Sequence, residues 1–333
     1  MKVSRRGFLR HGGGVVAGAG IGLTLPSSAE AAARETKNTD RVPTAILGRT
    51  GIKISILGLG TADLGEQNRK KPSVPKLVSV FSDAIDRGIT YVDTARIYGR
   101  AEEALATVLP KRRDKVVLAT KVWASTYEEA KTSFEESLAT MKVDRVDVAH
   151  IHSLGDKDVD AILGKQGALR YLEEQKKNGR TRAVGITGHS RPANFVRLLE
   201  TGKIDVMMVA MNFVDRHIYG FEEKVLPVAR KHGTGVLAMK VFGGIRGGFR
   251  NYGARKPHPS QMSSEHHLES IRYARTLEGV TGMVIGVHSS EQVHRNIAMV
   301  LEAKPLSKKE LADLCEKGKP LAPRWTARFG PAE

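Results

Sequence analysis

The sequence predicts an α/β fold, a (β/α)8 TIM barrel with a short N-terminal hairpin and a C-terminal helical tail. Three features of the chain lead to this prediction. Short apolar runs of strand length recur along the chain after residue 44. A longer segment with apolar residues at helical spacing follows each run. The repeat occurs eight times, and eight such units in roughly 250 residues match a barrel of this kind.

The strand candidates are short and rich in branched apolar residues. In chain order they are Ile56–Leu59, Tyr91–Asp93, Val116–Thr120, Val146–Ile151, Ala183–Ile186, Val206–Met211, Val236–Met239 and Met283–Ile285. Strands that alternate with helices favour parallel pairing. The alternative is a doubly wound open sheet, but its G-x-G-x-x-G phosphate-binding pattern does not follow the first strand.

The helix candidates place apolar residues three and four positions apart, as Val78, Phe81 and Ile85 do. Eight of them belong to the repeat and one lies in the tail. They are Lys76–Arg87, Glu102–Leu109, Tyr127–Met141, Ala168–Asn178, Ala193–Leu199, Glu222–Lys231, Glu265–Thr276, Glu291–Leu301 and, in the tail, Lys308–Lys317. We expect the tail helix to pack across the barrel.

Two further features frame the repeat. Before the first strand, Thr44–Leu47 and Ile52–Ile54 flank a glycine-containing turn and predict a hairpin. Two segments, 154–167 and 241–263, are longer than ordinary connections from strand to helix. In a barrel both would lie at the C-terminal rim, where ligands bind.

The first residues have the composition of an export signal rather than of a folded domain. Ser4–Arg10 contains paired arginines followed by an aromatic residue and a leucine, and it resembles the twin-arginine export motif. A weakly apolar, glycine-rich stretch, Gly12–Leu25, comes next, and Ala29-Glu30-Ala31 offers a small-residue cleavage site. The apolar stretch is too short and too rich in glycine for a stable transmembrane helix.

These observations predict the domain organisation and the location of the protein. Residues 1–33 are predicted to be a twin-arginine signal, 34–43 a linker, and 44–333 the barrel. We expect the twin-arginine machinery to carry the folded protein to the periplasm or otherwise out of the cytoplasm. No stable membrane anchor is expected after cleavage.

The chain is basic, with a formal net charge of +17. Its cationic residues fall in several separate places, including Arg69–Lys76, Lys111–Lys115 and Lys176–Arg182. No aromatic-interleaved basic motif and no zinc-finger spacing is present, so a nucleic-acid partner is not expected. The single cysteine, Cys315, can form no internal disulfide and no cysteine-ligated cluster. Its apolar neighbours predict a buried, inert side chain.

Chemistry-bearing residues stand at the C-terminal ends of consecutive strands. Asp93 ends the second strand and Tyr98 follows on the next loop, Lys121 ends the third strand, and His152 ends the fourth. A buried carboxylate and a buried ammonium are each costly unless they are paired. An ammonium near a phenol lowers the pKa of the phenol by favouring the phenolate. The four side chains together therefore predict a proton-donating site.

A metal site is the alternative interpretation of the fourth strand. His150 and His152 are two positions apart on a strand and therefore face the same way. With Asp93 they could bind a metal in a barrel hydrolase, but no other strand end offers clear ligands, and we expect none. His150 alone is predicted to be a core or pocket residue. Three histidines in or near the second long segment are expected at the surface: His258, His266 and His267.

The motifs at the ends of the first four strands resemble the signatures of the aldo-keto reductase family. The resemblance spans roughly Thr44 to Leu301. It rests on Leu47-Gly48-Arg49-Thr50-Gly51-Ile52-Lys53-Ile54-Ser55 with Gly58-Leu59-Gly60-Thr61, Asp93-Thr94-Ala95 with Tyr98-Gly99 and Glu102, Ala119-Thr120-Lys121, and Asp147-Val148-Ala149-His150-Ile151-His152.

This resemblance implies reduction of an aldehyde, ketone or sugar carbonyl by hydride transfer from NADPH, or from NADH, without a metal. It assigns Tyr98 as the general acid that protonates the carbonyl oxygen. It also implies that Lys121, paired with Asp93, lowers the pKa of that phenol and that His152 orients the carbonyl. A cofactor-binding sensor or subunit that kept the fold without catalysis is the alternative within the same family.

The resemblance also assigns a set of cofactor positions. They are Gly60, Thr61, Asp93, Thr187, Gly188, Asn212, Met239, Lys240, Gly286, Gln292 and Asn296. Met239 and Lys240 replace the more usual aromatic–serine pair, so Met239 would pack on the nicotinamide and Lys240 would reach the pyrophosphate. Gln292 replaces an arginine that often binds the 2′-phosphate of NADP, a role that His288 or Arg295 could take. Some related proteins carry a C-terminal iron–sulfur module, which Cys315 alone excludes here.

Overall fold

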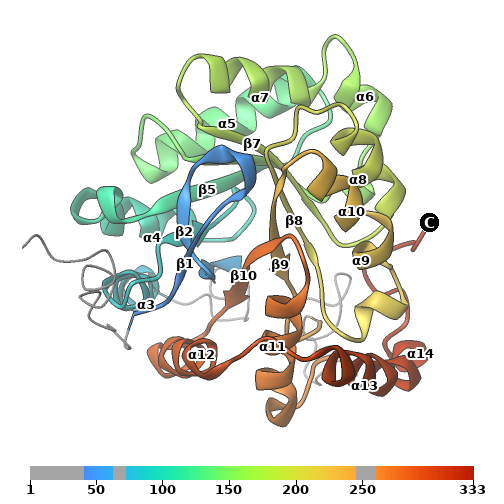
Figure 1. Cartoon of the computed structure of the whole chain (residues 1–333). Coiled ribbons are helices and arrows are strands. Elements are labelled where there is room, and N and C mark those ends of the chain that lie inside the picture. Colours follow the sequence, from blue (N-terminus) through green and yellow to red (C-terminus); the bar gives the residue numbers. More distant parts are fainter. Residues whose placement is uncertain (1–40, 63–72, 245–259) are drawn as a thin grey trace, which may run out of the picture. The chain divides into compact units, whose positions relative to one another are not determined.

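The computed structural model describes residues 41–62, 73–244 and 260–333. The predicted signal, most of the predicted linker and the middle of the 241–263 segment lie outside these ranges. Eight parallel strands close into a barrel in the order β10-β3-β4-β5-β6-β7-β8-β9, and helices surround it (Figure 1). The predicted barrel is therefore confirmed, and a doubly wound open sheet is excluded because the sheet has no edge.

Each barrel strand coincides with one of the predicted apolar runs. The strands are β3 (Leu57–Gly60), β4 (Tyr91–Asp93), β5 (Val117–Val122), β6 (Val148–Ile151), β7 (Ala183–Gly188), β8 (Val206–Ala210), β9 (Gly235–Met239) and β10 (Val280–Gly286). Nearly all of their residues are buried. This explains why the strands appear in the sequence as continuous apolar runs, since helices cover one face and the barrel interior the other.

The larger helices also follow the predicted segments. They are α3 (Val74–Asp86), α4 (Ala101–Val108), α5 (Tyr127–Met141), α7 (Ala168–Lys177), α8 (Pro192–Leu199), α11 (His267–Thr276), α12 (Ser290–Glu302) and, in the tail, α13 (Lys308–Gly318). A capping box fixes the start of α5, because Thr126 and Glu129 exchange side-chain to backbone hydrogen bonds there.

Two segments differ from the expectation. The predicted helix Glu222–Lys231 is divided into α9 (Phe221–Lys224) and α10 (Leu226–Lys231). Pro227 causes the division, because it has no N–H to donate to the preceding turn and so stands at the start of a new helix. The long segment after β6 contains a short helix, α6 (Val159–Leu163), which Asp158 caps by accepting two backbone N–H bonds.

The interior of the barrel is filled by alternate residues of the strands. This interior cluster contains Tyr91, Val117, Ala119, Val148, Ala183, Val206, Met208, Leu237, Met239 and Val284. Because side chains alternate along a strand, the next inward positions after Tyr91 and Ala119 are Asp93 and Lys121. The barrel geometry therefore directs both charged side chains into the interior at the C-terminal end.

The hairpin closes the opposite end of the barrel. Its strands β1 (Thr44–Ile46) and β2 (Lys53–Ser55) pair antiparallel, as predicted. Leu47 and Ile52, in and beside the turn, are almost fully buried and belong to the interior cluster. A Cβ atom on Gly235, the first residue of β9, would lie 2.7 Å from Leu47 Cδ1. Strand β9 therefore needs glycine where the Leu47 side chain packs against it. The hairpin crosses one mouth of the barrel in Figure 1.

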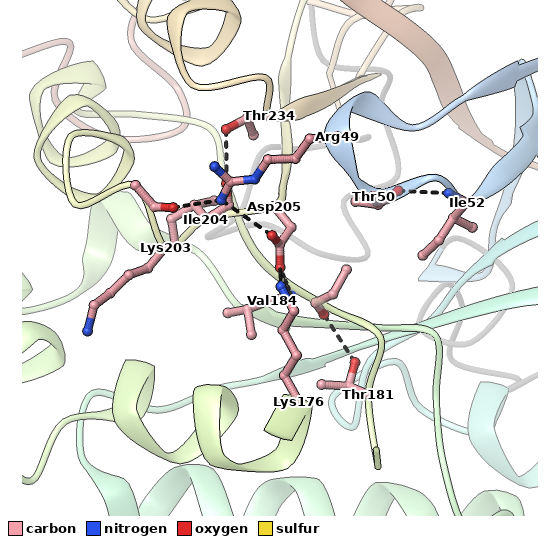
Figure 2. A network of polar contacts seen from close by, with 12 residues as sticks. Arg49, Thr50, Ile52, Lys176, Thr181, Val184, Lys203, Ile204, Asp205 and Thr234 are labelled. Atoms are coloured by element: carbon pink, nitrogen blue, oxygen red, sulfur yellow. Dashed lines mark hydrogen bonds and ion pairs between the residues drawn. The ribbon is translucent and has the colours of Figure 1, made fainter. Parts of the chain in front are cut away.

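A polar network around Asp205 attaches the hairpin to the barrel (Figure 2). One oxygen of this buried carboxylate accepts hydrogen bonds from the Val184 backbone N–H at 2.9 Å and from Lys176 Nζ at 2.6 Å. The other accepts from Arg49 Nη2 at 3.3 Å. Arg49 also donates to the carbonyl of Gly202 at 2.6 Å. One carboxylate thus connects the hairpin turn, α7 and two neighbouring strands.

The tail passes beside the barrel and returns to the C-terminal rim. Helices α13 and α14 (Ala322–Trp325) join a small apolar cluster that includes Phe213 and Tyr273. Arg328 forms a fully buried bidentate ion pair with Asp215, at 2.6 and 2.8 Å. No helix among the described residues is long and apolar enough to span a lipid bilayer.

Cys315 differs from its prediction. It is only half-buried, and its sulfur accepts a hydrogen bond from Arg216 Nη1 at 2.9 Å. Its flanking apolar residues indicated an inert core position, whereas the helix turns the thiol toward a guanidinium on another element.

We predict that replacing Asp205 with alanine destabilises the barrel by about 2–3 kcal/mol, because it leaves the Val184 N–H and the Lys176 ammonium without their acceptor and removes one of the acceptors of Arg49. Urea unfolding of the two proteins measures this difference. Asp160→Ala is the matched control, since that carboxylate is 82% exposed and its ion pair with Arg197 lies at the surface. The control should change stability by less than about 0.5 kcal/mol. Equal stabilities for both variants would contradict the anchoring role.

Candidate active site

A buried ion pair lies at the C-terminal end of the barrel. Lys121 Nζ is 2.6 Å from Asp93 Oδ2 and donates a second hydrogen bond to the Thr94 carbonyl at 2.9 Å. Lys121 is only 1% exposed. Burial raises the pKa of Asp93, although the charges of Lys121 and Lys240 act in the opposite direction. The second oxygen of Asp93 is buried and has no partner among the described residues.

Tyr98 lies on the loop after β4, beside this ion pair. The Lys121 ammonium stands 4.5 Å from the centre of the Tyr98 ring. The loop is anchored from α4, because the buried Glu102 accepts a hydrogen bond from Thr120 Oγ1 at 3.0 Å and one from Arg96 at 3.2 Å. Thr120 directly precedes Lys121 on β5. The Glu102 carboxylate therefore connects the loop that carries Tyr98 to the strand that carries Lys121.

His152 completes the group from the end of β6. Its ring lies edge-on to the Tyr98 ring, with 5.7 Å between centroids. Burial lowers the pKa of His152 well below its usual range, and the nearby charge of Lys121 adds to this effect. The imidazole is therefore neutral and retains one N–H donor. Its Nδ1 is buried and has no partner among the described residues.

His150 has a separate environment deeper in the barrel. Its Nε2 lies 3.2 Å from the Tyr91 hydroxyl, and burial lowers its pKa well below the usual range. Gly185 makes room for the ring, because a Cβ there would approach His150 Nδ1 to 2.2 Å. In the part of the chain that the structure describes, no group of three histidine, cysteine or acidic residues could hold a metal ion. A metal site at His150 and His152 would therefore have no third protein ligand among the described residues.

A cavity begins at Asp93 and Tyr98 and extends along the ends of β9 and β10 to the first turns of α12. It is bounded by several residues that the sequence assigned to cofactor binding. These are Gly60, Asp93, Met239, Lys240, Gly286, Gln292 and Asn296. Two of the four catalytic candidates, Asp93 and Tyr98, thus share one continuous space with most of the cofactor candidates.

Four predicted cofactor residues lie outside the cavity wall. Thr61 is buried and donates to the Asp93 carbonyl at 3.0 Å. Thr187 is buried near the end of β7, and its hydroxyl has no partner among the described residues. Gly188 packs closely on Phe195.

Asn212 is the fourth of these residues. Its amide nitrogen donates to Asp215 at 2.6 Å and to the Lys240 carbonyl at 3.0 Å, and its oxygen accepts from two backbone N–H groups. These bonds use the polar atoms of the side chain to hold the loop after β9 in place. Whether Asn212 also touches a cofactor stays a prediction.

The cavity wall also contains residues that the sequence did not single out, including Phe242 and Val284. His267, which was expected at the surface, is half-buried instead. Its ring stacks on Phe242 with 3.9 Å between centroids and also lines the cavity. The two residues are far apart in the sequence, and no local pattern indicates their contact. Phe242 alone could have been noticed, because it follows the end of β9.

An arginine and a histidine lie at the far end of the cavity. Arg295 on α12 and His288 before it both line the wall. The side-chain oxygen of Gln292, which lies between them in the sequence, accepts a hydrogen bond from the His288 backbone N–H at 2.6 Å. Arg295 forms no ion pair or hydrogen bond with another described residue. This end of the cavity is therefore suited to an anionic group.

Comparison with known proteins agrees with this geometry. The model of the aldo/keto reductase family matches residues 56–270. L-galactose dehydrogenase of Arabidopsis thaliana is 25% identical over 78% of this chain and 88% of its own length. Pyridoxal 4-dehydrogenase of Microbacterium luteolum is 24% identical over 78% and 93%. An aldo-keto reductase of Klebsiella pneumoniae, solved in complex with NADPH, has a TM-score of 0.64 at 22% identity and covers 83% of this chain and 95% of its own.

The chain belongs to the aldo/keto reductase family. It is accordingly an NAD(P)-dependent oxidoreductase that acts on carbonyl compounds, built on a (β/α)8 barrel.

Proposed function

We propose that the protein reduces an aldehyde, ketone or sugar carbonyl with Tyr98 as the general acid, and that it catalyses the reverse oxidation through the same residues. One observation carries this assignment. The Lys121–Asp93 ion pair lies against the Tyr98 ring, the neutral His152 lies edge-on to the same ring, and Asp93 and Tyr98 are part of the cavity wall.

The residues present fit a nicotinamide dinucleotide. Asp93 is part of the cavity wall, and its Oδ1 is a buried polar atom without a partner among the described residues, so it can bond a polar group of a bound ligand. Gly60 and Gly286 face each other closely, since a Cβ on Gly60 would lie 3.2 Å from the Gly286 nitrogen. Lys240 is a cation on the cavity wall and would hold the pyrophosphate. A reduced nicotinamide bound there would supply the hydride.

The chain itself binds and protonates the carbonyl. His152 donates its N–H to the carbonyl oxygen and orients it, while the Tyr98 hydroxyl donates its proton to the same oxygen as negative charge develops. Burial of His152 matters here, because a neutral imidazole donates a hydrogen bond without competing with Tyr98 as the acid. The product is an alcohol.

Lys121 and Asp93 act on the proton of Tyr98. The ammonium beside the ring stabilises the phenolate that remains after proton transfer. Asp93 offsets the burial of that ammonium and holds it in one position. In the oxidative direction the same phenolate accepts the proton of an alcohol, so one arrangement serves both directions.

We also propose that the enzyme prefers NADPH to NADH. Arg295 and His288 line the end of the cavity beyond Gly286, where a 2′-phosphate would meet a guanidinium that has no partner among the described residues. Arginine recognises phosphate through two parallel hydrogen bonds. The NADPH-bound Klebsiella structure shares the fold of this chain.

We further propose that residues 1–33 form a twin-arginine signal and that the mature enzyme acts outside the cytoplasm. The proposal rests on Arg5-Arg6 before Phe8 and Leu9, and on the alanine-rich cleavage site. Export of the folded protein suits an enzyme that takes up its cofactor before it crosses the membrane.

Replacing Tyr98 with phenylalanine should lower kcat/KM for carbonyl reduction about 10²- to 10⁴-fold, because the general acid is lost. NADPH and NADH oxidation against a panel of aldehydes, ketones and sugars measures the change. Cofactor affinity should stay within about twofold. Tyr127→Phe, which removes a surface hydroxyl bonded to Glu174, is the control and should retain activity. If the wild-type protein binds cofactor but turns over no carbonyl, the non-catalytic sensor interpretation is correct instead.

Arg295→Ala should weaken NADPH binding about tenfold or more and leave NADH binding within about twofold, because only NADPH carries the 2′-phosphate. Fluorescence titration of both cofactors gives the dissociation constants without any turnover. Arg324→Ala removes an exposed arginine in the tail and serves as the control. An equal loss for both cofactors would show that Arg295 does not discriminate between them.

Changing Arg5 and Arg6 together to lysine should keep the full-length protein in the cytoplasm, since the export pathway reads the arginine pair. Cell fractionation and the mass of the recovered chain measure this. Arg34→Lys, in the predicted linker, should be exported and shortened like the wild type. Unchanged export of the double variant would refute the signal.

A further inference from the structure

An exposed tryptophan lies beside the candidate active site. Trp123 follows β5, is 43% exposed, and lies edge-on to His152 with 5.3 Å between ring centroids. His152 is therefore flanked by two aromatic rings, Tyr98 on one side and Trp123 on the other. A large apolar side chain left exposed next to a reacting centre provides a surface on which a substrate can lie.

A lysine is held over the same indole ring. Lys157, which follows the turn after β6, places Nζ 4.1 Å from the centre of Trp123. This cation–π contact restrains an otherwise flexible side chain. The ammonium and the His152 imidazole thus both contact the Trp123 ring. A compact molecule that reaches His152 with its carbonyl would have the ammonium within reach of its other end.

No carboxylate of the described residues forms an ion pair with Lys157. Glu129 is near enough to act on its charge, but that carboxylate accepts the backbone N–H groups of Ser125 and Thr126 at 2.9 and 3.0 Å. The Asp156 carboxylate also acts on the charge of Lys157 without forming an ion pair with it. Partial burial lowers the pKa of Lys157, which indicates that water does not fully solvate the ammonium.

The charges around His152 favour an anion. Lys121 is in ion-pair contact with Asp93, whereas Glu129 and Asp156 act on the charge of Lys157 without such a contact. Burial is the main cause of the lowered pKa of His152, and the charge of Lys157 acts in the same direction. A negative group on the substrate would give the ammonium a direct, charged hydrogen-bond acceptor, which neither Glu129 nor Asp156 supplies.

We propose that Lys157 and Trp123 select carbonyl substrates that carry a carboxylate, namely aldehyde acids and keto acids; this inference rests on the proposed carbonyl reduction at the same site. Trp123 provides the surface against which the body of the substrate packs. Lys157 binds the carboxylate, and His152 and Tyr98 hold the carbonyl. The selection acts in binding, so it appears in KM more than in kcat.

Binding without turnover tests the anion site directly. Benzoate and benzamide are matched in shape and differ in charge, and quenching of Trp123 fluorescence reports their dissociation constants. We expect benzoate to bind about tenfold more tightly than benzamide, since a hydrogen bond to a charged partner is worth that factor. Lys157→Gln should remove the difference, Lys157→Arg should keep it, and Lys53→Gln, at the opposite end of the barrel, should keep it. Equal affinities in the wild type, or a preference that survives Lys157→Gln, would overturn the proposal.

Kinetics with 4-formylbenzoate and its methyl ester provide the second measurement. Wild-type kcat/KM should be about tenfold higher for the acid, and Lys157→Gln should bring the ratio near one, mainly through KM. Reduction of acid and ester with equal kcat/KM would refute the selection while leaving carbonyl reduction intact. Charge-selective binding together with no reduction of either compound would refute carbonyl reduction and retain the anion site. The two proposals therefore fail in distinguishable ways.

Discussion

The catalytic end of this barrel depends on the buried ion pair between Lys121 and Asp93. Removing both charges from water is expensive, and their attraction compensates only when the geometry is close and the remaining hydrogen-bond groups are used. The 2.6 Å contact and the additional bond to the Thr94 carbonyl meet these conditions in part. The second Asp93 oxygen has no partner among the described residues, and Asp93 is part of the cavity wall. The Asp93 carboxylate therefore both pairs with Lys121 and forms part of the cavity wall.

The rest of the barrel keeps the surroundings of that pair dry. Leu47 and Ile52 of the hairpin fill the opposite end of the interior, and the Asp205 network holds the hairpin there. Between the two ends, the inward positions of the strands are mostly apolar or glycine, and the buried His150 and the Tyr91 hydroxyl contact each other. In such an interior, electrostatic interactions are stronger than in water. The hairpin thus supports the action of Lys121 on Tyr98 although it touches neither residue.

Much of the fold could be predicted because the signals are local. The strands are continuous apolar runs, since they are buried on both faces, and strand ends indicate where Asp93, Lys121 and His152 lie. Predictions were wrong where one residue overrides the periodicity, as Pro227 does in dividing a helix, or where a contact forms between distant segments. The burial of His267 depends on Phe242, which lies on another element.

The sequence by itself determined the barrel, the order of its strands, and four chemistry-bearing residues at successive strand ends. These follow from periodicity and from the rule that parallel strands present their C-terminal ends at one rim. Only the tertiary structure decided which rim residues meet: the Lys157 ammonium over Trp123, and the His267 ring on Phe242. The physical reason is that rim loops have no repeating pattern. Side-chain packing between segments from different strands sets their conformation, and that packing exists only when the barrel is closed.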